Sequence, residues 1–154
     1  MEENYILSVE GKQTVNGSSD KIDLKTRAAY MTKNGSRYIT YTEYDVNNPK
    51  LTSRTTVKVS PDNVVTVMKG GTERHSLILE KGVRHKCEYI TSFGIISLGV
   101  FTDTVNVNLN DKGGEIKLHY NIDVQSELAS SNELIINIKE ANENVSSSSD
   151  STTA

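Results

Sequence analysis

The side chains of this chain that could do chemistry are one cysteine, three histidines and several tyrosines with a glutamate among them. Cys87 and His85 stand two residues apart, so in a strand they share one face. His75 precedes the Lys81-Gly82 turn, which would bring it across a hairpin from His85. A zinc site built from these three side chains would lack a fourth ligand and any paired cysteine motif. We therefore predict no metal and no cofactor, and we interpret Cys87 as a small core residue.

A polar cluster around Glu43 is the second candidate. Glu43 shares a strand face with Tyr41, and a carboxylate that points into a protein needs a basic partner or a raised pKa. Near a histidine, Glu43 would orient a ligand in a barrel mouth. The competing interpretation is that Glu43 is solvated at the rim and the tyrosines simply pack. The candidate ligand-binding residues are Tyr41, Glu43, His75, His85, Tyr89, Phe93 and Tyr120.

Catalysis finds little support in the residue pattern. A Cys87 nucleophile would need a lowered thiol pKa and a third group that orients its base. The chain has no motif for a serine nucleophile, a phosphate loop or a dinucleotide fold. We predict no catalytic residues and favour a non-enzymatic protein, with Glu43 and His75 or His85 as the acid–base pair of the enzyme alternative.

The elements that must position these residues are strands. From Ile116 to Val124 apolar and polar residues alternate, which indicates a strand with one dry and one wet face and directs His119 to water. Turn signals such as Asn16-Gly17 and Asn34-Gly35 recur at short intervals and favour antiparallel hairpins. We expect strands over residues 5–15, 22–32, 37–44, 51–59, 64–69, 74–80, 85–93, 95–109 (broken or bulged), 115–124 and 133–139.

This succession of hairpins predicts an all-β fold, an antiparallel meander β-barrel of lipocalin-like type with about eight to ten strands. An open two-layer sandwich is the competing architecture. Residues 125–131 form at most one helical turn. A set of basic residues in the middle strands is expected on the outer face, among acidic neighbours that would pair with it: Arg54, Lys58, Lys69, Arg74, Arg84 and Lys86.

Length, charge and composition limit the number of domains, the partners and the cellular location. The 154 residues suit one barrel domain, 1–140, followed by a Ser/Thr-rich tail, 141–154, that we expect to be disordered. A net charge of −3 without clustered Lys and Arg argues against a nucleic-acid partner. The weakly polar run 93–101 is too short for a membrane helix, so no membrane partner is expected. An acidic start without an apolar run, together with the lone Cys87, predicts a cytoplasmic protein.

A family resemblance rests on three short runs and one threonine, in this order: Tyr89-Ile90-Thr91-Ser92-Phe93-Gly94, Thr102, Gly113-Gly114-Glu115-Ile116 and Tyr120-Asn121-Ile122. The chain from 5 to 139 resembles the YwiB-like family of small bacterial proteins of unknown function. The resemblance implies a calycin-like, lipocalin-like meander barrel and no activity. The chain departs from the family pattern at Ser92, where a proline is expected, and at Met68-Lys69-Gly70-Gly71, where Lys69 replaces a planar arginine.

Three functions follow as hypotheses. The leading one is a non-enzymatic barrel whose mouth binds a small amphipathic molecule, which requires a cavity of roughly 300–1,000 Å³. The second is a protein-interaction or homodimerisation module that uses a strand edge or a sheet face. The third is the enzyme described above. The identity of a ligand or partner lies beyond these residues.

Overall fold

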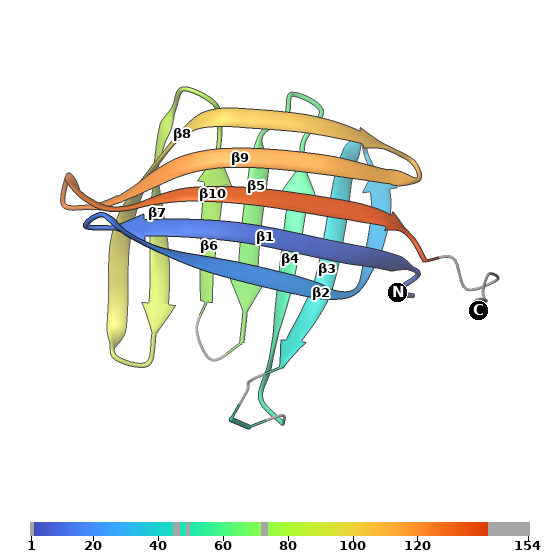
Figure 1. The fold of residues 1–154 in the computed structure, drawn as a ribbon, viewed down its shortest axis with the longest axis horizontal. Coiled ribbons are helices and arrows are strands. Elements are labelled where there is room, and N and C mark those ends of the chain that lie inside the picture. The colour runs from blue at the N-terminus through green and yellow to red at the C-terminus, as the bar shows by residue number, and fades with distance from the viewer. Residues whose placement is uncertain (1, 45–46, 49, 72–73, 142–154) are drawn as a thin grey trace.

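A computed structural model describes residues 2–141 except 45–46, 49 and 72–73. Each strand is antiparallel to the next, and β1 also pairs with β10, so the meander closes into a barrel (Figure 1). The closed barrel predicted from the hairpins is therefore confirmed, and the open sandwich is wrong. The described residues form β1 (Tyr5–Val15), β2 (Ser18–Lys33), β3 (Ser36–Tyr44), β4 (Thr52–Val59), β5 (Val65–Gly70), β6 (Arg74–Leu79), β7 (Arg84–Thr91), β8 (Gly94–Asn110), β9 (Gly113–Val124) and β10 (Glu127–Glu140).

Residues with positive φ form the tight turns. Asn16 and Gly17 have φ of 51° and 80°, the left-handed pair that matches the twist of a two-residue hairpin. Gln125 and Ser126 also have positive φ, 53° and 68°, and close a two-residue turn between β9 and β10. Residues 125–131 therefore contain no helical turn, within the limit of one turn set by the sequence, because this segment reverses the chain and then continues as a strand.

The long strand β8 carries the irregularity that its length predicted. Its pairing with β9 shifts between Thr102 and Thr104, so one extra residue forms a β-bulge. The bulge lets a strand of 17 residues bend with the barrel wall. The expectation of a broken or bulged strand is confirmed.

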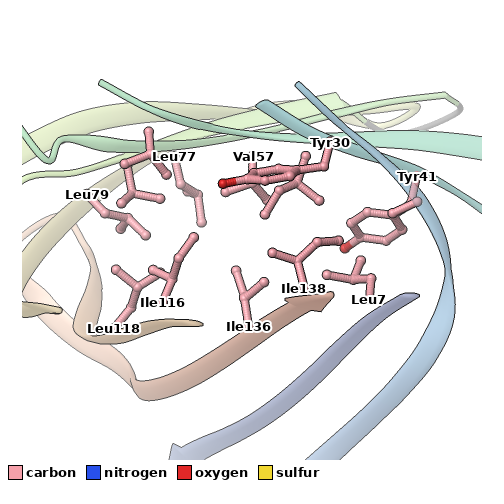
Figure 2. Close-up of a cluster of buried hydrophobic side chains, with 14 of the residues drawn as sticks. Leu7, Tyr30, Tyr41, Val57, Leu77, Leu79, Ile116, Leu118, Ile136 and Ile138 are labelled. Atoms are coloured by element: carbon pink, nitrogen blue, oxygen red, sulfur yellow. The ribbon is translucent and has the colours of Figure 1, made fainter. Parts of the chain in front are cut away.

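The apolar core occupies one half of the barrel, near the end where β1 begins and β10 ends. Most of its fully buried side chains lie in the first half of odd-numbered strands or the second half of even-numbered ones. Figure 2 shows Ile116 and Ile136 on one wall, pointing across the interior toward Val57 and Leu77 on the other. The largest fully buried side chains are Leu7, Ile39, Leu79, Ile116, Ile138, Val65, Val100 and Thr102.

A polar and aromatic layer seals this packed end. Tyr30 of β2 reaches across the barrel and donates a 2.6 Å hydrogen bond to the carbonyl oxygen of Asn110, the last residue of β8. Arg37 donates to the Tyr30 hydroxyl at 3.2 Å and forms an ion pair with Asp111 at 3.1 Å. The Tyr5 ring packs edge-on against Tyr30 with 5.2 Å between ring centroids. We call this end the sealed end.

Candidate functional site

The opposite end of the barrel is open, because apolar side chains on inward-facing positions there remain exposed. Ile22 and Val15 continue the inner faces of β2 and β1, yet they are 61% and 42% exposed. Ile96 of β8, opposite the inward-facing Tyr89, is 46% exposed. A wall that stays apolar on its inner side without being covered is the lining of a mouth.

A cavity of about 240 Å³ leads inward from this mouth. It is larger than a cavity of about 150 Å³ that accommodates benzene in another protein, and smaller than the 300–1,000 Å³ expected for a drug-sized ligand. Its volume therefore suits one or two rings or a short chain. The apolar lining comes from Leu77, Leu98, Ile122 and Leu134, and the polar lining includes His75, Tyr89, Tyr120 and Asn132.

A continuous row of polar side chains crosses the inner wall at this level. Along five neighbouring strands, each member lies directly opposite the next, and directly opposed residues point to the same face. The row starts at Tyr41, opposite the buried Thr55, and ends at Tyr89. The Tyr89 ring stacks on His75 with 5.0 Å between ring centroids. The members in order are Tyr41, Thr55, Lys69, His75 and Tyr89.

Glu43 projects beside this row, one inward position nearer the mouth than Tyr41. Thr55 donates a 3.1 Å hydrogen bond from its hydroxyl to Glu43 Oε1, and Lys69 Nζ lies 3.9 Å from the same oxygen. Burial raises the pKa of Tyr41 to about 12, and the nearby negative charge of Glu43 adds to that rise. Burial also raises the pKa of Tyr120 on the opposite wall. The tyrosine hydroxyls are therefore neutral hydrogen-bonding groups at physiological pH.

The structure places five of the seven candidate ligand-binding residues on the inner wall near the mouth. His75, Tyr89 and Tyr120 line the cavity, while Tyr41 and Glu43 lie on β3, on the inner wall but not among the residues that line it. These positions agree with the strand faces that alternation predicts. Whether any of these side chains binds a ligand stays a prediction.

His85 is not part of this group. In the antiparallel pair of β6 and β7 the partner of His75 is Tyr89, because both histidines lie near the first residues of their strands. His85 sits toward the sealed end, with its Nε2 2.9 Å from Glu80 Oε1. The expected approach of His75 to His85 is therefore wrong.

Phe93 and Lys69 also depart from the expected faces. Phe93 lies in the β7–β8 turn and is 99% exposed, since the alternation of β7 ends at Thr91. Lys69 was expected on the outer face, but it lies opposite the buried Thr55 and continues the inner face of Val65. Residues 65, 67 and 69 alternate along the strand, so this spacing predicts that Lys69 shares the inner face of Val65 and Val67.

Cys87 is buried at 5% exposure, in agreement with the interpretation as a core residue. It lies near a gap in the wall, where β6 and β7 share only the pairs Arg74–Ile90 and His75–Tyr89. A groove of about 590 Å³ follows this gap, with Cys87 among its lining residues. Over the described ranges, no group of three His, Cys, Asp or Glu side chains is arranged to hold a metal ion. No helix there is long and apolar enough to cross a membrane.

The fold and this site define the class: an all-β protein, a closed ten-stranded antiparallel meander barrel with one sealed end and one open end. The chain belongs to the family described as Domain of unknown function (DUF1934), whose model matches residues 7–136. The resemblance found in the sequence is therefore confirmed.

Two comparisons with a bacterial protein support this membership. The chain is 29% identical over 112 residues to the "Uncharacterized beta-barrel protein YwiB" of Bacillus subtilis (strain 168), covering 72% of this chain and 75% of that protein. The crystal structure of the ywiB protein from Bacillus subtilis superposes with a TM-score of 0.78 at 23% identity, over 90% of this chain and 92% of that one. This likeness establishes the fold, and the family carries no known activity.

Proposed function

We propose that this protein is a non-enzymatic barrel that binds a small amphipathic molecule in its open mouth. The observation that carries the proposal is the difference between the two ends of the barrel. Tyr30 and Arg37 close one end, whereas inward-facing apolar residues such as Ile22 stay exposed at the other. Covering that apolar surface with a ligand would be favourable by about 25 cal/mol for each Å² removed from water.

The chemistry of the lining supports an amphipathic ligand. Leu98, Ile122 and Leu134 offer an apolar wall, and the Tyr120 hydroxyl and Asn132 amide offer a few hydrogen-bonding groups. Small-molecule sites typically combine these two features. A cytoplasmic location is part of the proposal, since a lone buried cysteine fits a reducing compartment.

The geometry favours binding over acid–base catalysis. Thr55 donates a hydrogen bond to Glu43, and Lys69 lies close to the same carboxylate oxygen. These neighbours occupy the carboxylate oxygen that an acid–base step would use. His85 is at the sealed end and is far from this carboxylate along the strands.

The test is a titration of the protein with naphthalenemethanol, an uncharged amphipathic probe, in which isothermal titration calorimetry measures the binding. The wild-type chain should bind one equivalent, and Ile122→Trp should abolish binding because the larger ring fills the cavity. Lys117→Trp is the matched control: it lies on the same strand, points outward and should bind like wild type. Because the chain has no other tryptophan, the fluorescence of each variant also reports whether the new ring is buried.

Two results would contradict the proposal: no binding by the wild type, or equal loss of binding in both tryptophan variants. Native mass spectrometry of the protein from its own host extends the test, since a bound natural molecule should be displaced by the probe. A displaced species identifies the ligand directly.

A second candidate function is self-association through the rim of the mouth. Phe93 and Leu128 protrude from hairpins at that end and are 99% and 68% exposed. Light scattering should then give a dimer mass that falls to the monomer in Phe93→Ser. A monomer for the wild type at all concentrations would remove this candidate.

A further inference from the structure

The inner wall of the mouth carries a cation whose hydrogen-bonding capacity is largely unused. Among the described residues, the Lys69 ammonium makes no hydrogen bond, because its 3.9 Å approach to Glu43 is beyond hydrogen-bonding range. The same Glu43 oxygen already accepts the hydroxyl proton of Thr55. An ammonium has three donors, so Lys69 can take up a further acceptor without breaking a bond.

The position of Lys69 connects this cation to the cavity. Its direct cross-strand partner is His75, which lines the cavity together with Tyr89 and the apolar Leu77. Lys69 has a side chain 35% exposed, so water reaches its head from the mouth. A ligand with its apolar body against Leu77 can therefore direct a polar group at the ammonium.

We infer that the ligand of this barrel is a small organic anion, an aromatic or short aliphatic carboxylate whose charged group is bound by Lys69. This inference rests on the proposed function, because it names the ligand class of the same mouth. An amine ligand fits less well, since it would meet the ammonium of Lys69 and compete with it for Glu43. A neutral ligand could accept a hydrogen bond from Lys69 but would gain no attraction to its charge.

Glu43 sets the strength of this interaction. Its negative charge partly balances Lys69 and repels an incoming carboxylate at short range. Replacing Glu43 by glutamine keeps the acceptor for Thr55 and removes the charge. The variants Lys69→Met and Glu43→Gln should therefore change anion affinity in opposite directions.

The experiment compares naphthoate with naphthalenemethanol, two probes that share one ring system and differ in charge. The wild-type chain should bind naphthoate more tightly than the alcohol. Lys69→Met should weaken naphthoate binding about tenfold, which corresponds to about 1.4 kcal/mol, and leave the alcohol unchanged. Glu43→Gln should strengthen naphthoate binding, and Lys58→Met, an outward-facing lysine on β4 beside the Tyr38 ring, should bind both probes like wild type.

The outcomes distinguish the assignment of an anionic ligand from the proposal that the mouth binds a small molecule. If the wild type binds the alcohol and does not prefer naphthoate, or if Lys69→Met weakens both probes equally, the anion assignment fails while the binding site stands. If neither probe binds the wild type, the proposed function fails and the assignment fails with it. A salt-dependent preference for naphthoate that Lys69→Met abolishes supports both.

Discussion

Removing the hydroxyl of Tyr41 should change how the barrel responds to alkaline pH. Tyr41 is 8% exposed, and its burial beside Glu43 raises its pKa from 10.0 to about 12. Below pH 10 the hydroxyl is neutral in the folded and in the unfolded chain. Between pH 10 and pH 12 the unfolded chain loses this proton while the folded chain still holds it. The free energy of unfolding must therefore fall over this range.

The size of the loss follows from the shift. Two pKa units at 1.36 kcal/mol each give about 2.7 kcal/mol of stability that is present below pH 10 and gone above pH 12. In Tyr41→Phe this contribution disappears, so the alkaline loss should be smaller than in wild type by about that amount. In Glu43→Gln the loss should be smaller and should end at a lower pH, because the second cause of the raised pKa of Tyr41 has been removed.

Urea unfolding at a series of alkaline pH values measures this difference, with tyrosinate absorbance as an independent record of ionisation. Tyr38→Phe is the matched control, since it removes a hydroxyl from the outer face of the same strand. At neutral pH, Tyr41→Phe should cost no more than about 1 kcal/mol. Equal alkaline losses in wild type and Tyr41→Phe would refute the reasoning and show that Tyr41 is in contact with water.

Three further predictions concern the frame of the barrel. Gly114→Ala should lower the free energy of unfolding in urea by at least about 3 kcal/mol, because the φ of Gly114 is 140° and a Cβ there would overlap the backbone oxygen of Asn108. Gly70→Ala is the control: it has open space around it and should cost under about 0.5 kcal/mol. Arg84→Gln should lose the two hydrogen bonds to Asp123, of 2.9 and 2.7 Å. Since Arg84 lowers the pKa of Asp123, the free energy of unfolding of the variant should be below that of wild type at neutral pH, and the difference should vanish as acid protonates the Asp123 carboxylate. Thr102→Val should raise the melting temperature, because the buried Thr102 hydroxyl has no hydrogen-bond partner among the described residues and its removal is worth about 1 kcal/mol.

The sealed and open ends give the barrel an uneven distribution of stability. Fully buried side chains such as Leu7 and Ile138 gather near the sealed end, where the Tyr30 and Arg37 layer ties β2 and β3 to the β8–β9 connection. The mouth depends instead on strand pairing and a polar row. Hydrogen exchange should therefore be slowest in the strand segments near the sealed end.

Strand faces were readable from the residues because side chains alternate with a period of two. That periodicity correctly placed His119 outside, and Tyr89 and Tyr120 inside. The same periodicity indicates that Lys69 faces inward with Val65 and Val67, but we had expected it outside because it is basic. Phe93 was misplaced because a turn ends the alternation, and the boundary between strand and turn is weakly marked in sequence. Of the tail expected to be disordered over 141–154, residues 142–154 lie outside the described residues.

Local pattern thus determined the all-β class, the hairpins and most inward faces, because each depends on neighbours within a few residues. Only the tertiary structure decided that β1 pairs with β10, that one end is sealed, and that a cavity of about 240 Å³ remains at the other. The bond from Tyr30 to Asn110 joins residues 80 positions apart. Contacts of that separation leave no periodic signal, so the depth of the mouth and the charge within it follow from closure of the whole barrel.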